Sequence, residues 1–323
     1  MPMRRNVDTT GVVFVVLAAI GFGLGGPLAR AAGEVGFNGA TFAFWRSVGS
    51  VMALVGLFAG GLAIHRLPRV PLRSIGGIEW LQLLAMGLFV AGTTLGLFLG
   101  FERSTIALAL IVFYTYPILV AVAAVRIYDE PLGSRRLAAI LLASCGMVLV
   151  VLGPGSAEGD GVDLLGVLFA LLAALCQAGY ALVAARGFAS VPTFQAATLL
   201  RGFSLLAYLI VLVPLVLLLG DSDRLLGPLD GVDAWALIVI AGVFSAALPT
   251  AGLVAGYRRV GPTRGAVLML LEPVTGVLLA ALLFAEQPAP VQLLGGLLVL
   301  AGAVLVQLTP SRHGPAEAEP VAE

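Results

Sequence analysis

The chain of 323 residues has little charge, since Asp, Glu, Lys and Arg make up 11% of it, against about 25% in an average soluble domain. Lysine is absent, so all 18 basic residues are arginines. Hydrophobic residues make up 60%, and the mean hydropathy is +1.06. This composition excludes an ordinary soluble domain and is typical of a protein that crosses a membrane many times.

Residues that carry enzyme chemistry are also scarce. The only histidines, His65 and His313, lie in a loop and in the C-terminal tail, and Cys145 and Cys176 lie inside apolar runs as small core residues. They offer neither a metal-ligand cluster nor a nucleophile beside a histidine. No Walker-type Gly-Lys-Ser/Thr loop and no basic tract is present. We therefore expect no enzyme, catalytic residue, metal, cofactor or nucleic-acid partner.

Apolar runs of the length of a spanning helix, about 17–25 residues, recur along the chain. The ten predicted helices are Gly11–Ala32, Ala40–Leu62, Ile78–Gly100, Thr105–Val125, Arg136–Gly153, Leu164–Ala185, Phe194–Leu219, Ala234–Tyr257, Arg264–Ala285 and Val291–Leu308. The first is interpreted as a retained helix, because it is too long for a signal peptide. An acidic, glycine-rich loop, Pro154–Asp163, separates two sets of five helices. The polar tail, residues 309–323, is predicted to be disordered.

The two sets of helices repeat one another. At an offset of 156, Gly96, Gly100, Arg103, Pro117, Glu130 and Gly146 fall on Gly252, Gly256, Arg259, Pro273, Glu286 and Gly302. At an offset of 155, Gly11, Phe14, Arg46, Trp80, Gly87 and Phe89 fall on Gly166, Phe169, Arg201, Trp235, Gly242 and Phe244. A slip of one residue in the third helix reconciles the offsets. Five helices are an odd number, so residues 11–153 and 164–308 are predicted to be inverted repeats, the plan of secondary transporters.

Arginine placement predicts the orientation, because loops on the cytoplasmic side carry an excess of positive charge. With both termini in the cytoplasm, only Arg30, Arg103 and Arg224 lie outside. Arg46 and Arg201 lie within helices, and the remaining arginines lie inside.

Glu272 is the sharpest functional candidate, because a carboxylate at membrane depth costs about 2.5–3.5 kcal/mol and usually faces a cavity. Beside Pro273, it could bind a proton or a cationic group of a substrate. Alternatively, it accepts hydrogen bonds from a broken backbone or pairs with an arginine. Its counterpart in the first repeat is Tyr116, so a pocket between the repeats need not be symmetric in charge.

Pro117 and Pro273 are predicted to bend the fourth and ninth helices. These bends are either hinges for alternating access or packing features. Arg46, near the outer end of its helix, and Arg201, near the inner end, are either gate or substrate residues on opposite faces or structural residues that reach the nearest interface or backbone carbonyl. The structural interpretation is favoured for the arginines.

Polar side chains at membrane depth are candidate cavity residues. They are Gln177, Tyr180, Tyr114, Thr115, Tyr116, Thr93 and Thr275. Hydroxyls of Thr and Ser can instead satisfy the carbonyls of their own helix, so both roles stay open for the threonines.

The chain resembles the drug/metabolite transporter superfamily, in particular its EamA-type ten-helix exporters. The residues that carry the resemblance are Trp45-Arg46, Tyr116-Pro117 with Asp129-Glu130, Leu271-Glu272-Pro273 with Glu286, and the closing helices with Gly146 and Gly302. The resemblance implies a basket of helices around a central cavity, with the fifth and tenth helices at the periphery. It further implies efflux of amino acids, related metabolites or drugs.

Together these features predict an all-α integral membrane protein of the bacterial cytoplasmic membrane, embedded in lipid and either monomeric or homodimeric. It would export a small-molecule substrate, with protons as the coupling ion at Glu272. The alternatives are an uncoupled facilitative carrier of the same fold and, less favoured, a membrane enzyme or a scaffold.

Overall fold

A computed structural model describes residues 8–37, 39–63, 67–103, 106–128, 133–152, 163–188, 190–219, 227, 229, 231–284 and 289–308, and within them it contains helices and no strand. In the first half the elements are α1 (Thr9–Gly23), α2 (Gly25–Glu34), α3 (Gly39–Ala63), the short 3-10 turn η1 (Leu72–Ser74), α4 (Gly77–Arg103), α5 (Ile106–Phe113), α6 (Tyr116–Ile127) and α7 (Ser134–Val151). In the second half they are α8 (Leu164–Arg186), α9 (Thr193–Leu219), α11 (Val232–Gly242), the π-helical turn η2 (Val243–Ala247), α12 (Leu248–Val260), α13 (Pro262–Met269), α14 (Leu271–Phe284) and α15 (Pro290–Gln307).

Within the described residues, nine helical segments are long and apolar enough to cross a membrane, and Pro290–Val306 is a shorter apolar helix. Each of them overlaps one of the ten runs expected from the sequence. Large apolar side chains on many helices face outward, as in Leu282, which is 79% exposed, and Ile78, which is 78% exposed. An apolar outer surface of this kind is stable only in lipid. The chain is therefore a multi-pass integral membrane protein.

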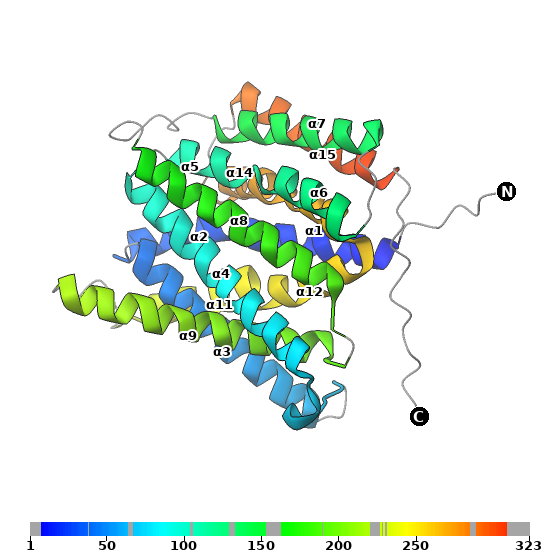
Figure 1. Cartoon of the computed structure of the whole chain (residues 1–323). Coiled ribbons are helices and arrows are strands. Elements are labelled where there is room, and N and C mark those ends of the chain that lie inside the picture. Colours follow the sequence, from blue (N-terminus) through cyan, green and yellow to red (C-terminus); the bar gives the residue numbers. More distant parts are fainter. Residues whose placement is uncertain are drawn as a thin grey trace.

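The helices are arranged with one pair along each of two opposite edges and the others between them (Figure 1). α7 and α15 pack against each other along one edge of the molecule, and α3 and α9 lie at the opposite edge. Between them, α4 packs against α8, and α1 packs against α12. The predicted repeat relates α1 to α8 and α4 to the membrane segment that contains α12. It would therefore relate the α4–α8 pair to the α12–α1 pair.

Small residues let α7 and α15 approach closely. A Cβ built on Gly146 would lie 2.6 Å from the carbonyl oxygen of Gly295, and one built on Gly295 would lie 2.5 Å from that of Gly146. Backbones that touch in this way are the usual means by which membrane helices associate, because apolar side chains gain little from each other in lipid.

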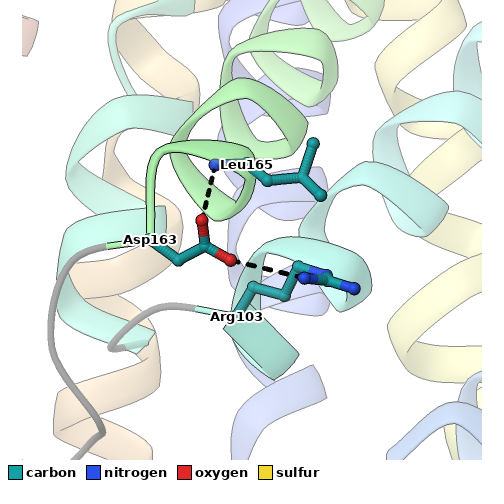
Figure 2. Close-up of polar contacts among 3 residues, drawn as sticks. All are labelled: Arg103, Asp163 and Leu165. Atoms are coloured by element: carbon teal, nitrogen blue, oxygen red, sulfur yellow. Dashed lines mark hydrogen bonds and ion pairs between the residues drawn. The ribbon is translucent and has the colours of Figure 1, made fainter.

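The end of α4 is tied to the start of α8 at the surface (Figure 2). Asp163 accepts a hydrogen bond from the backbone N–H of Leu165 at 2.9 Å, which caps α8, and its other carboxylate oxygen lies 3.4 Å from Nη1 of Arg103. The two side chains are 44% and 52% exposed, so the ion pair itself contributes little and the cap contributes more.

The third helix of the second half contains one turn of π-helix, whereas its counterpart α4 is a continuous α-helix. The sequence repeat changes its offset from 155 to 156 between Phe244 and Gly252, so the second half holds one additional residue in this interval. A π-turn closes its hydrogen bond one residue later than an α-turn and so accommodates one additional residue. The η2 turn, at Val243–Ala247, is thus the structural form of the slip in the repeat.

Several expectations fall on residues outside the described ranges. They concern Glu130, Glu286, Asp129, His65, His313, Arg224, most of the loop Pro154–Asp163 and the tail 309–323.

Candidate functional site

Three of the membrane segments are broken rather than continuous. The first is interrupted at Leu24, between α1 and α2, the fourth at Tyr114 and Thr115, between α5 and α6, and the ninth at Leu270, between α13 and α14. Pro117 and Pro273 lie in the first turn of the helix that follows their break, where a proline has no hydrogen bond to lose. The bends expected at both prolines are therefore present as breaks, and their use as hinges remains a prediction. The interruption at Leu24 was not expected.

Glu272 lies in the first turn of α14, directly after the break. Its side chain is half-buried, and it forms no hydrogen bond or ion pair with any residue that the structure describes. A helix N-terminus favours a carboxylate, because the unpaired N–H groups there carry partial positive charge. The N–H groups at the N-terminus of α14 therefore stabilise the carboxylate of Glu272, and its oxygens stay available to another partner.

The broken first helix passes between Glu272 and Arg46. A Cβ on Gly23 would lie 2.8 Å from the carbonyl oxygen of Glu272, and one on Gly25 would lie 3.4 Å from Nη1 of Arg46. Only glycine fits at Gly23 without moving α14. Arg46 and Glu272 interact electrostatically across this point.

Both intramembrane arginines bind the segment that contains the π-turn. Arg46 donates from Nη1 to the carbonyl and hydroxyl oxygens of Ser245, each at 3.4 Å. Arg201 donates to Oγ1 of Thr250 from Nε at 2.8 Å and from Nη2 at 2.6 Å, and its Nη2 also contacts the carbonyl oxygen of Ala246 at 3.3 Å.

Arg46 and Arg201 come together at one segment. Their partners lie within five residues of each other, and the two guanidinium groups interact electrostatically. They meet because the long side chains of α3 and α9 both reach the same helix, and their role as gate residues stays a prediction. The favoured structural interpretation included contacts to carbonyls of a neighbouring helix, and both arginines make such contacts.

Tyrosines surround this polar centre. Tyr180, Tyr208 and Tyr257 are at most 2% exposed. The hydroxyl of Tyr180 forms no hydrogen bond within the part of the chain that the structure describes, whereas that of Tyr208 lies beside Thr94 and that of Tyr257 lies beside Tyr116. The Tyr180 and Tyr257 rings are packed edge to face at 6.4 Å. Tyr116 donates from its hydroxyl to the carbonyl oxygen of Ala266 at 3.3 Å, and both Tyr116 and Tyr114 lie close to Glu272. A buried hydroxyl without a partner costs about 1–3 kcal/mol, so the hydroxyl of Tyr180 is a candidate to bind another molecule.

The predicted threonine ligands bind backbone carbonyl groups of described residues, whereas the predicted glutamine ligand does not. Thr115 donates to Val112 at 2.7 Å and Thr275 donates to Leu271 at 2.8 Å, each within its own chain segment. Thr93 contacts the carbonyl oxygen of Ala173 on α8 at 3.5 Å. Their hydroxyls therefore serve the backbone in this conformation. Gln177 is half-buried on α8 and forms no hydrogen bond to a described residue, so its amide remains a candidate.

Two tyrosines of the centre were not selected from the sequence. Tyr208 follows Arg201 by seven residues, and Tyr257 follows Thr250 by seven. Residues seven apart lie on the same face of a helix, so the spacing from a polar residue at membrane depth was the signal that could have identified them.

An apolar hollow with a volume of about 640 Å³ lies beside this centre and is separate from it. It is lined from α1 by residues that include Gly21, from the break after α1 by Leu24, from the π-turn by Phe244, and from α12 by Pro249. Leu17, Ile20 and Phe244 are also exposed on the outer surface, so the hollow opens toward the lipid. No group of three His, Cys, Asp or Glu side chains that could hold a metal ion is found among the described residues.

Comparisons with known proteins agree with this architecture. A solved structure matches with a TM-score of 0.72 at 19% identity, covering 93% of this chain and 96% of that one. A protein of Bacillus subtilis named uncharacterized transporter YxxF is 23% identical over 225 residues, which is 70% of this chain and 69% of that protein. A protein of Synechocystis named uncharacterized transporter sll1319 is 28% identical over 196 residues, or 59% of this chain and 56% of that protein.

The sequence profile of the EamA-like transporter family matches twice, over residues 9–152 and 164–308. These two regions contain all of the helices described above and every residue of the polar centre. The chain therefore belongs to the EamA-like transporter family, a family of membrane transporters rather than enzymes.

Proposed function

We propose that this transporter is a secondary carrier that exports small metabolites, such as amino acids, related compounds or drugs, across the bacterial cytoplasmic membrane. Glu272 is the carboxylate that binds a coupling proton or part of the substrate. Both termini are cytoplasmic, and residues 11–153 and 164–308 act as two inverted five-helix repeats that move relative to each other.

The observation that carries this proposal is the state of Glu272. A carboxylate that is half-buried at membrane depth, follows a helix break and has no partner among the described residues is expensive to keep for structure alone. The neighbouring positive charge of Arg46 helps to hold its ionised form. A proton or a substrate group can displace that interaction, which is what a coupling residue requires.

The breaks in the first, fourth and ninth membrane segments supply the mobile elements of the mechanism. Carrier sites are commonly formed by discontinuous helices whose ends face the ligand. In this chain, α2, α6 and α14 each begin directly after a break, and α14 brings Glu272 to that position.

The test is flux in liposomes that contain the purified protein. A thermal-shift panel of proteinogenic amino acids and common antibiotics first identifies a transported probe. Flux of that probe is then measured with and without an imposed proton gradient, for the wild type, for Glu272→Gln and for Glu34→Gln. Glu34 is an exposed carboxylate at the end of α2 and is the matched control.

We expect the proton gradient to accelerate flux in the wild type and in Glu34→Gln but not in Glu272→Gln. Gradient-dependent flux that is the same in all three proteins would contradict the role of Glu272. Flux that never depends on the gradient in the wild type would instead support the uncoupled facilitative carrier.

A further inference from the structure

The charges at membrane depth do not balance. In the described spanning segments, Arg46, Arg201 and Glu272 are the acidic or basic side chains that lie about two helical turns or more from either end of their segment. Two guanidinium groups face one carboxylate, so the centre has an excess of one positive charge when Glu272 is ionised. A net charge in this environment is costly unless something neutralises it.

Among the residues that the structure describes, no second carboxylate pairs with these arginines. The hydrogen-bond acceptors of Arg201 are Thr250 and Ala246, and those of Arg46 belong to Ser245; all are neutral. Neither guanidinium forms a salt bridge with an acidic side chain in the described ranges. Among the described residues, the hydrogen bonds of both guanidinium groups therefore go to neutral groups of the π-turn segment.

The two arginines differ in how much of their donor capacity is used. Arg201 is 7% exposed and is engaged through Nε and Nη2. Arg46 is half-buried, and its hydrogen bonds to described residues come from Nη1 alone, at the long distance of 3.4 Å. Its Nε and Nη2 remain as a fork of donors, which matches the two oxygens of a carboxylate.

Neutral donors lie beside the charged ones. Tyr208 lies close to Arg46 and Arg201, and Tyr180 lies close to Arg201. Both side chains are more than nine-tenths buried; the Tyr180 hydroxyl forms no hydrogen bond to a described residue, and the Tyr208 hydroxyl lies beside Thr94. A tyrosine hydroxyl can donate to an anion, and its ring offers an apolar surface for the rest of a small molecule.

We propose that the substrate of this carrier is a small organic anion with one net negative charge, whose carboxylate binds the free Nε and Nη2 of Arg46 beside Tyr208. The proposal rests on the transport function proposed above and narrows its substrate class. Arg201 binds the π-turn segment and acts on the substrate through its positive charge rather than through a direct contact. A ligand of net charge minus one would neutralise the centre, whereas an amine, an amide or a zwitterion would not.

The experiment compares four probes with nearly the same skeleton on the purified protein in detergent. They are 3-phenylpropanoate as the anion, 3-phenylpropanamide as the neutral form, phenylalanine as the zwitterion and phenethylamine as the cation. Thermal shift ranks them, and equilibrium binding measures the strongest. The buffer anion is gluconate, and chloride is added in a separate series to detect a site for an inorganic anion.

We expect the anion alone to raise the unfolding temperature and to bind saturably. Arg46→Gln should weaken its binding on the order of 10- to 100-fold, the loss expected for hydrogen bonds to a charged group. Arg103→Gln, which removes an exposed arginine paired with Asp163, is the matched control and should leave binding unchanged. Ser245→Ala keeps the charge and the contact of Arg46 with the carbonyl oxygen but removes its contact with the hydroxyl, so it should weaken binding to a smaller extent and serves if Arg46→Gln does not fold.

The inference is overturned if the amide, the zwitterion or the amine binds the wild type as well as the anion does, if none of the four binds, or if chloride alone reproduces the full shift. A neutral or cationic probe that binds and is carried into liposomes would refute the anion and leave the transport function intact. Failure of all flux, with the anion still bound through Arg46, would refute transport and leave the anion site intact.

Discussion

The hydroxyl group of Thr250 accepts hydrogen bonds from the buried guanidinium group of Arg201, and its removal should lower the free energy of unfolding. Thr250 Oγ1 accepts two hydrogen bonds from Arg201, at 2.8 and 2.6 Å, and donates to the carbonyl oxygen of Ala246 at 2.7 Å. Thr250 is 1% exposed and Arg201 is 7% exposed. Thr250→Val preserves the shape of the side chain but leaves two N–H groups of the guanidinium without an acceptor.

The size of the effect follows from these contacts. Hydrogen bonds to a charged group contribute about 1.5–3 kcal/mol each, and a buried donor that loses its partner incurs its desolvation penalty. Arg201 retains its contact with Ala246, so we expect a net loss of about 3 kcal/mol. At about 2 °C per kcal/mol for a large domain, the unfolding temperature should fall by about 6 °C.

Thr198→Val is the matched control for this change. Thr198 lies on α9 one turn before Arg201, is half-buried, and donates only to the carbonyl oxygen of Phe194 in its own helix, at 2.9 Å. Its loss should change stability by less than about 0.5 kcal/mol. Intrinsic-fluorescence melting in detergent compares both variants with the wild type. An unfolding temperature for Thr250→Val that equals that of Thr198→Val would refute the interpretation of Thr250 as the support of Arg201.

Two further predictions concern packing and capping. Gly146→Val should separate α7 from α15, because its side chain would overlap the backbone around Gly295. We expect the free energy of unfolding to fall by at least about 3 kcal/mol, measured by thermal melting. Gly202→Ala is the control and should not destabilise the protein, because a Cβ at Gly202 would meet open space. Asp163→Asn should be nearly neutral, because Asn still caps α8 and the exposed pair with Arg103 contributes less than about 1 kcal/mol, whereas Asp163→Ala should lose about 1 kcal/mol in the same assay.

The helical, membrane-spanning character of the chain could be predicted from the sequence because its signals are local and strong. Apolar runs of spanning length stand out in any chain, and prolines have few permitted positions in a helix. The breaks before α6 and α14 were accordingly anticipated at Pro117 and Pro273. The break at Leu24 was not, since the glycines around it are as common elsewhere in this chain and only the approach of Glu272 and Thr275 to Gly23 explains it.

The polar centre was predicted in part. Glu272, Tyr116 and Tyr180 were selected because polar groups at membrane depth are rare. The meeting of Arg46 and Arg201 at one segment could not be predicted, because it depends on how α3 and α9 pack against η2 and α12. Residue spacing places a side chain on a face of its own helix, but the partner on another helix is set by tertiary packing.

The π-turn at Val243–Ala247 has a consequence for the energetics of the proposed transport cycle. In an inverted repeat of two identical halves, the inward-open and outward-open conformations would be related by symmetry and would have equal free energy. Here the second half has an additional residue that the first half lacks, and the arginines bind the segment around it. If the halves form the proposed inverted repeat, the two conformations are inequivalent, and their resting populations would differ even before a substrate or a gradient acts on them.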